Sequence, residues 1–161
     1  MTRQMTMVAL CLLPALVSAL RHEADPYTLE GRVYCDTCRL GFETSASTYI
    51  QGAKVRVECS DRNTKELLYT AEGITDSTGS YKIFIKEDQG DRICDAKLVG
   101  SPQEDCKLAD PARDRSRVIL TSNNGIISKH RFANSLGFVK DQPLAVCAQL
   151  LQQYELYEDE N

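Results

Sequence analysis

Short segments in which apolar and polar residues alternate dominate the chain. In residues 54–59 a charged residue precedes each of Val55, Val57 and Cys59, which leaves one face apolar. A period of two is typical of a β-strand with one buried face. The same pattern predicts further strands at residues 29–36, 66–75, 81–85, 94–99, 117–121 and 126–132. These closely spaced strands predict an all-β fold, an antiparallel β-sandwich or small barrel of about seven strands.

Two turn signals separate the predicted strands. Residues 76–79, Asp-Ser-Thr-Gly, combine turn-forming side chains with a glycine that can adopt positive φ. Residues 123–125, Asn-Asn-Gly, are typical of a tight hairpin turn. We therefore expect the last two strands to pair as a hairpin.

The pattern changes near the C-terminus, where the apolar spacing becomes helical. Pro143 is well suited to the first turn of a helix. The apolar stripe that follows consists of Leu144, Cys147, Leu150, Leu151 and Tyr154. The sequence predicts a short helix that packs on the sheet and is held there by Cys147. The alternative is a helix that contacts a partner.

Cysteine usage indicates the compartment. Cys11 lies in an apolar N-terminal segment that follows Arg3, and residues 1–19 are predicted to be a cleaved signal peptide. Residues 20–161 then form a single domain of a secreted, extracellular protein. Six cysteines remain in it: Cys35, Cys38, Cys59, Cys94, Cys106 and Cys147. An even number behind a secretion signal predicts three disulfides, and spacing alone leaves their pairing open.

Composition narrows the function classes further. The 161 residues carry a formal charge of −4 and include no tryptophan. A mildly acidic chain does not favour nucleic-acid binding, which requires a basic surface. No second apolar stretch is long enough to span a membrane, so no membrane span is expected after signal removal.

Candidate chemistry is sparse. Residues 35–38 form a Cys-x-x-Cys, a motif that serves redox catalysis or zinc binding in other contexts. Here it closes a strand, no second ligand pair follows, and His22 and His130 are isolated, so structural disulfides are favoured. His130 lies between two basic residues and is interpreted as a surface residue. We predict a protein that is not an enzyme, with no catalytic residue, cofactor or metal.

A longer signature resembles a known family. Residues 30–39, EGRVYCDTCR, are similar to the signature of the secreted plant proteins related to the olive major pollen allergen, the Ole e I-like family. Further matches are Gly79-x-Tyr81, Cys94, Asp105-Cys106, Leu136-Gly137-Phe138 and Cys147-Ala148-Gln149. The resemblance implies a mostly β domain. It also implies the disulfides Cys35–Cys106, Cys38–Cys147 and Cys59–Cys94.

The same resemblance implies an extracellular role in pollen germination or tube growth, and potential allergenicity. The expected partner is a receptor-like kinase ectodomain or a cell-wall component. We expect the loops at 39–49 and 107–117 to make the contact. Charge reversal of Arg113, Arg115 and Arg117 is then expected to weaken capture of the partner without lowering thermal stability. The alternatives are a small-molecule carrier with a ligand in a barrel cavity and a wall-associated structural or polysaccharide-binding protein.

Overall fold

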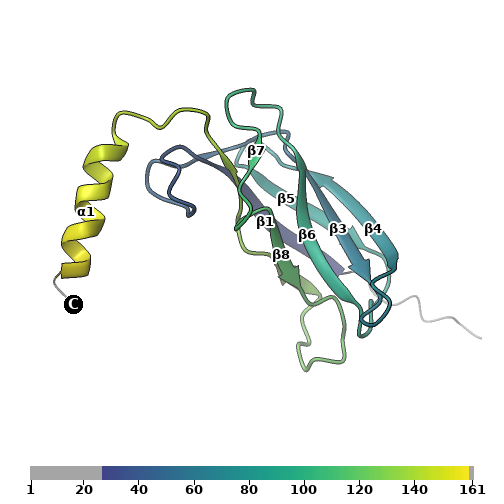
Figure 1. Cartoon of the computed structure of the whole chain (residues 1–161). Coiled ribbons are helices and arrows are strands. Elements are labelled where there is room, and N and C mark those ends of the chain that lie inside the picture. The colour runs from purple at the N-terminus through teal and green to yellow at the C-terminus, as the bar shows by residue number, and fades with distance from the viewer. Residues whose placement is uncertain (1–26, 160–161) are drawn as a thin grey trace, which may run out of the picture.

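The computed structural model describes residues 27–159, which form two packed β-sheets followed by a helix that extends away from them (Figure 1). The predicted signal peptide lies outside the described residues. The elements are β1 (Tyr27–Asp36), β2 (Thr48–Tyr49), β3 (Lys54–Ser60), β4 (Leu67–Ile74), β5 (Ser80–Ile85), β6 (Ile93–Gly100), β7 (Leu108–Ala109), β8 (Arg115–Val118), β9 (His130–Phe132), β10 (Leu136–Val139) and α1 (Cys147–Asp159). The all-β prediction with one C-terminal helix is confirmed. The two sheets form an open sandwich.

One sheet has four strands, all antiparallel, in the order β4-β3-β6-β8. Cys59 of β3 and Cys94 of β6 are directly opposite each other and are joined by a disulfide. The solvent face of this sheet carries ion pairs between neighbouring strands, including Arg56–Glu72 at 2.7 Å and Arg117–Asp95 at 2.6 Å. The charged positions of residues 54–59 therefore face water, as their alternation predicted.

The other sheet has six strands arranged around β1. On one side β1 pairs with β5 and then with β2, both antiparallel. On the other side it pairs with β9 and then with β10, both parallel. The sequence predicted antiparallel pairing throughout, but the chain returns to β1 in the same direction after β8. The strands β2, β7 and β10 were not predicted.

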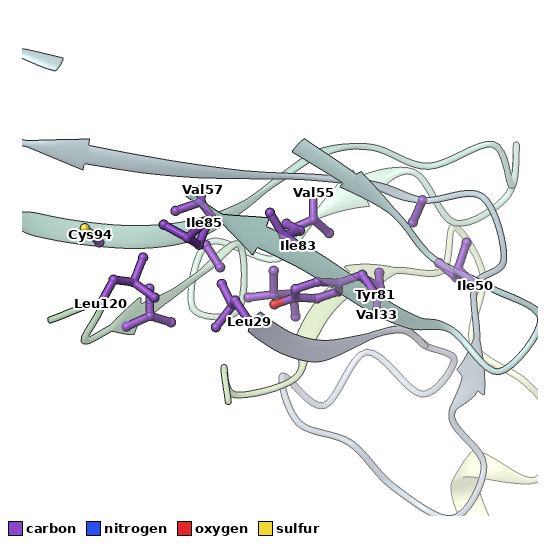
Figure 2. Packing of buried hydrophobic residues seen from close by; sticks show 14 of the residues in the cluster. Leu29, Val33, Ile50, Val55, Val57, Tyr81, Ile83, Ile85, Cys94 and Leu120 are labelled. Carbon is purple, nitrogen blue, oxygen red and sulfur yellow. The ribbon is translucent and has the colours of Figure 1, made fainter. Parts of the chain in front are cut away.

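Side chains from both sheets fill the space between them. Val55 and Val57 of β3 pack toward Ile83 and Ile85 of β5, with Leu29 of β1 beside them (Figure 2). All five are buried. Each such side chain contributes about 1.5–3 kcal/mol when it is removed from water. The alternation in β3 and β5 thus produces the core on one face and leaves the other face mostly polar, with Phe84 of β5 exposed on it.

Two glycines in the six-stranded sheet make room for buried tyrosines. Tyr81 of β5 lies directly opposite Gly31 of β1, and a Cβ at Gly31 would come within 2.5 Å of the Tyr81 Cζ. Tyr34 of β1 lies opposite Gly137 of β10, where a Cβ would come within 2.8 Å of the Tyr34 Cζ. Each ring therefore covers a position that only glycine can occupy without displacement.

The first prediction concerns this close contact. We expect Gly31→Ala to lower the free energy of unfolding by about 2 kcal/mol, because the added methyl group must displace the Tyr81 ring. Urea denaturation measures the change. The matched control is Gly100→Ala, since a Cβ at Gly100 meets no atom within 4 Å. Equal unfolding free energies for the two variants would show that the ring moves aside without cost.

The hairpin predicted at residues 123–125 is wrong. The strand before it, β8, belongs to the four-stranded sheet, while β9 pairs with β1 in the other sheet. The connecting loop, residues 119–129, is instead held by the buried Arg131 of β9. Its guanidinium donates hydrogen bonds to the carbonyls of Ile119, at 2.9 Å, and Thr121, at 3.1 Å, and also to that of Ser128. These hydrogen bonds hold the loop in place of the backbone hydrogen bonds that paired strands of a hairpin would have formed.

The helix also differs from its prediction. It begins at Cys147 and not at Pro143, because the Leu144 N–H donates to the Thr37 carbonyl at 3.1 Å and holds the preceding residues beside β1. It does not pack on a sheet. Cys147 and Leu150 instead contact Cys38, Leu40 and Ala46, which belong to the segment after β1.

Candidate functional site

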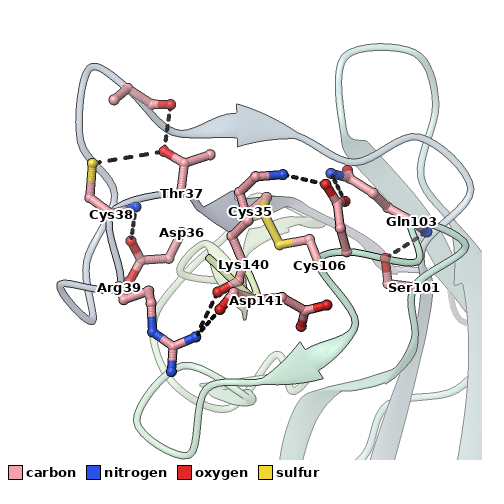
Figure 3. The surroundings of a disulfide bond; sticks show 12 residues. Cys35, Asp36, Thr37, Cys38, Arg39, Ser101, Gln103, Cys106, Lys140 and Asp141 are labelled. Atoms are coloured by element: carbon pink, nitrogen blue, oxygen red, sulfur yellow. Dashed lines mark hydrogen bonds and ion pairs between the residues drawn. A yellow bond between two sulfur atoms is a disulfide. The ribbon is translucent and has the colours of Figure 1, made fainter. Parts of the chain in front are cut away.

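The candidate site is the end of the sandwich where β1 ends. A tight turn follows β1 there, and the side chain of Asp36 stabilises it. The buried Asp36 carboxylate accepts hydrogen bonds from the backbone N–H groups of Cys38, at 3.2 Å, and Gly41, at 2.7 Å. Arg39 adopts a φ of 59°, which is uncommon for a residue with a side chain. Its guanidinium donates to the carbonyls of Lys140 and Asp141, which hold this conformation (Figure 3).

Two disulfides connect this turn to distant segments. Cys35 is bonded to Cys106, and Cys38 is bonded to Cys147. All four cysteines are buried. These pairs, together with Cys59–Cys94, are the pairs that the resemblance implies. The two cysteines of the Cys-x-x-Cys are therefore bonded to separate segments and not to each other. The motif anchors a loop and a helix at the end of one strand.

Most of the two loops predicted to make the contact lies together at this end. Arg113 donates from Nε to the Gly41 carbonyl at 2.9 Å, which joins residues 107–114 to residues 39–49, while residues 115–117 belong to β8. The backbone of Arg113 also accepts a hydrogen bond from the Gly137 N–H. We call the resulting surface the stapled end, and it comprises residues 36–49, 101–114 and 140–154.

The three arginines of the predicted charge-reversal experiment do not lie on one surface. Arg113 is half-buried and links two loops. Arg115 and Arg117 lie on β8, outside the stapled end, and pair with Asp114 and Asp95. A triple charge reversal would therefore disrupt the loop junction and two ion pairs, so it cannot report on binding alone.

Tyr34 lies beneath the stapled end among charged groups. Burial raises the pKa of its hydroxyl to about 12, and the nearby carboxylates of Asp36, Asp110 and Glu43 act in the same direction. The Arg113 guanidinium lowers the pKa but does not offset burial. The Tyr34 hydroxyl therefore stays protonated at physiological pH. It serves packing over Gly137 and offers no ionised oxygen for chemistry.

Apolar side chains are exposed over the stapled end. Phe42 and Tyr154 contact each other edge to face, with ring centroids 5.6 Å apart. The exposed large apolar side chains of this surface are Phe42, Tyr49, Leu108, Leu144, Val146, Leu151 and Tyr154. Exposed apolar groups gathered around rigid loops are typical of a protein-contact surface. Sequence reasoning had assigned the helical stripe to packing on the sheet and missed this exposure.

The second prediction tests how the helix is held. We expect the variant Cys38→Ala/Cys147→Ala to lose amide protection in residues 147–154, because few contacts would still hold α1. They are a small cluster around Leu150 and the edge-to-face contact between the Tyr154 and Phe42 rings. Amides of β3 and β6 should stay protected. Hydrogen exchange followed by mass spectrometry measures both regions. If the helix kept its protection, its docking would not depend on the disulfide.

Other sequence-derived candidates lie apart from the stapled end. His130 is exposed on β9, as predicted, with its Nδ1 3.6 Å from a Glu30 carboxylate oxygen. Within residues 27–159 no group of three or more His, Cys, Asp or Glu side chains is placed to hold a metal ion. Among the helices of the same residues, none is long and apolar enough to cross a membrane.

Comparisons with known proteins identify the family. Residues 25–155 match the family model described as "Pollen protein Ole e 1 like". The chain is 43% identical to pollen-specific protein C13 of Zea mays, over 99% of this chain and 94% of that protein. It is 44% identical to the protein DOWNSTREAM OF FLC of Arabidopsis thaliana, over 90% and 88% of the two chains.

A solved structure shows the same fold. The crystal structure of the major plantain pollen allergen Pla l 1 superimposes with a TM-score of 0.67 at 30% identity, and the match covers 74% of this chain and 97% of that one. The shared sandwich and the matches along almost the whole chain agree with the motif at residues 30–39. This chain belongs to the Ole e 1-like family of pollen proteins.

Proposed function

We propose that this protein is a secreted pollen protein and allergen that binds an extracellular partner through its stapled end. The names of its relatives, which include a pollen-specific protein and pollen allergens, support the tissue and the allergenicity. The three disulfides are consistent with an oxidising, extracellular compartment. The pollen-specific protein C13 and the allergen Pla l 1 have names that describe no enzymatic activity, which supports a binding role.

The observation that carries the proposal is the union of two loops and a helix into one rigid, partly apolar surface. The disulfides at Cys35 and Cys38 hold these segments to one strand end, which reduces the entropy lost when a partner is bound. Phe42, Leu151 and Tyr154 supply apolar and aromatic contacts of the kind that dominate protein interfaces. A receptor-like kinase ectodomain is the partner that we propose.

The carrier alternative has less support. It would place an apolar ligand between the sheets, but side chains from both sheets occupy that space. The wall-associated alternative remains an outcome of the experiment below, in which a polysaccharide would be retained in place of a receptor.

Affinity capture from pollen-tube or stigma membrane extract tests the proposal. The oxidised protein should retain a receptor-kinase ectodomain that a reduced and alkylated sample does not retain. Phe42→Asp and Leu151→Asp should abolish this retention, because a charge in the contact surface is costly to desolvate. The control is Ile127→Asp, which alters a 96% exposed apolar residue outside the stapled end.

The outcomes separate the surfaces. Retention lost in both stapled-end variants and kept in Ile127→Asp supports the proposal. Retention that is unchanged by Phe42→Asp and Leu151→Asp would remove the stapled end as the contact surface. Retention of a wall polysaccharide alone would favour the wall-associated function.

A further inference from the structure

A separate surface, on the outer face of the six-stranded sheet, carries an open groove of about 620 Å³. Residues of β1, β4, β5 and β9 line it, together with the turn after β4 and the segment after β9. The side chains used in the argument below are Glu30, Arg32, Ile74, Asp76, Lys82 and Phe132. The volume lies within the range of about 300–1,000 Å³ that is typical of small-molecule sites. Nothing in the proposed function uses this face.

Two strongly exposed apolar side chains line the groove. Phe132 of β9 is 74% exposed and Ile74 at the end of β4 is 62% exposed. Neither packs in the core, and Phe132 follows directly after Arg131, whose side chain is turned inward. The ring of Phe132 is thus presented to solvent by the pairing of β9 with β1. Its face offers a platform to an apolar, weakly positive C–H surface.

The remaining lining is polar and balanced in charge, with two acidic and two basic side chains. Lys82 pairs with Glu30 at 2.9 Å. The Arg32 guanidinium lies 3.9 Å from the centre of the Tyr49 ring and donates to the Tyr49 hydroxyl. Asp76 uses Oδ1 to accept hydrogen bonds from its own turn, at Thr78 and Ser80. These contacts fix the polar groups, and the balance of charge favours a neutral ligand.

Gly31 and Tyr81 also line the groove, but Tyr81 contributes no side chain to its surface. The Tyr81 side chain points to the opposite, inner face of the sheet, where its ring packs near Val33 and Leu29 (Figure 2) and its hydroxyl lies over Gly31. The side chains that a ligand would contact are therefore those of the outer face.

We propose that this groove binds a short neutral oligosaccharide. A pyranose ring has an apolar C–H face, which suits Phe132, and a rim of hydroxyl groups that both donate and accept. Carboxylates accept from such hydroxyls and the guanidinium and ammonium groups donate to them, so the four charged side chains match the rim. The balanced charge disfavours an acidic saccharide.

Titration of the full oxidised protein tests the proposal, with backbone amide NMR signals as the readout. The probes are cellotriose, β-1,4-galactotriose and laminaritriose, with trigalacturonate as the charged comparison. We expect at least one neutral trisaccharide to shift the amides of residues 30–32, 80–82 and 131–133. Phe132→Ala should weaken that binding about tenfold, because the stacking surface is lost. Ile127→Ala, which alters an even more exposed apolar residue outside the groove, should leave the binding unchanged.

The proposal is overturned if no neutral trisaccharide shifts these amides at millimolar concentration, if the shifts persist in Phe132→Ala, or if trigalacturonate binds more tightly than the neutral probes.

Discussion

Replacing Cys35 and Cys106 together by alanine should lower the free energy of unfolding by about 4 kcal/mol, through the lost constraint on the unfolded chain. The bond closes a loop between residues 71 positions apart and joins β1 to the segment before β7. Both cysteines are fully buried, so the two alanines also leave space at the end of the core. Chemical denaturation with the other two disulfides intact measures the change.

The matched comparison is the variant Cys38→Ala/Cys147→Ala. Its disulfide closes the longer loop, 109 residues, so chain entropy alone predicts a slightly larger loss. The structure predicts a smaller loss, because this bond ends in a helix that lies outside both sheets (Figure 1). The helix can detach while the sandwich stays folded. A larger loss for the Cys38–Cys147 variant would show that the helix belongs to the cooperative unit.

Arg131→Met should lower the free energy of unfolding by about 3 kcal/mol. The guanidinium is buried and satisfies carbonyls of Ile119, Thr121 and Ser128, and it also lies 5.0 Å from the centre of the Tyr27 ring. Methionine has a similar length but no donor, so these carbonyls lose their partners. Denaturation and amide exchange across residues 119–129 measure the effect.

Two further substitutions distinguish the cause. Arg131→Lys should restore less than half of the free energy of unfolding that Arg131→Met loses. A single ammonium group cannot donate to all the carbonyls that the planar guanidinium contacts in different directions. Arg115→Met should change stability by no more than about 0.5 kcal/mol, since Arg115 is exposed and pairs with its neighbour Asp114. If Arg131→Lys kept the full free energy of unfolding, the positive charge would account for the stabilisation and the multiple hydrogen bonds of the guanidinium would not.

The sequence predicted the strands whose alternation is strict. In β3 each apolar residue is buried, and in β5 the alternating residues Tyr81, Ile83 and Ile85 are buried while Phe84 is exposed. The pattern alone therefore placed both strands correctly. β10 was not predicted because Gly137 interrupts the apolar pattern of a strand of only four residues. Gly137 makes room for the Tyr34 ring, and this role becomes visible only when β10 is paired with β1. The two-residue strands β2 and β7 are too short for any periodicity to be visible.

β9 shows why some side-chain directions cannot be predicted from pattern. An apolar–polar alternation would place Phe132 inward and Arg131 outward, and the structure has the reverse. The buried arginine is stabilised by carbonyls of a loop whose path depends on both sheets, so no local signal reveals it. This reversal is also what exposes Phe132 in the groove.

The stapled end was predicted in part. The loops at 39–49 and 107–117 were recognised separately, but their junction through Arg113 and Gly41 depends on the register of β10 beside β1. The pairing of the six cysteines came from the family resemblance, because spacing does not determine it. The exposed apolar stripe of α1 was misassigned, since helical periodicity indicates an apolar face without indicating what covers it.

The position of β1 has a consequence for the order in which the chain can fold. Among the described strands it is the first to be synthesised, yet its parallel neighbours β9 and β10 come near the end of the chain. A nascent chain that lacks residues 130–139 therefore carries β1 with one open edge, which can pair with another molecule. Cys35 and Cys38 likewise cannot form their disulfides until Cys106 and Cys147 have been synthesised. Pairing between segments so far apart in the sequence slows folding. The emerging chain therefore depends on protection of β1 until β10 has been synthesised and can pair with it.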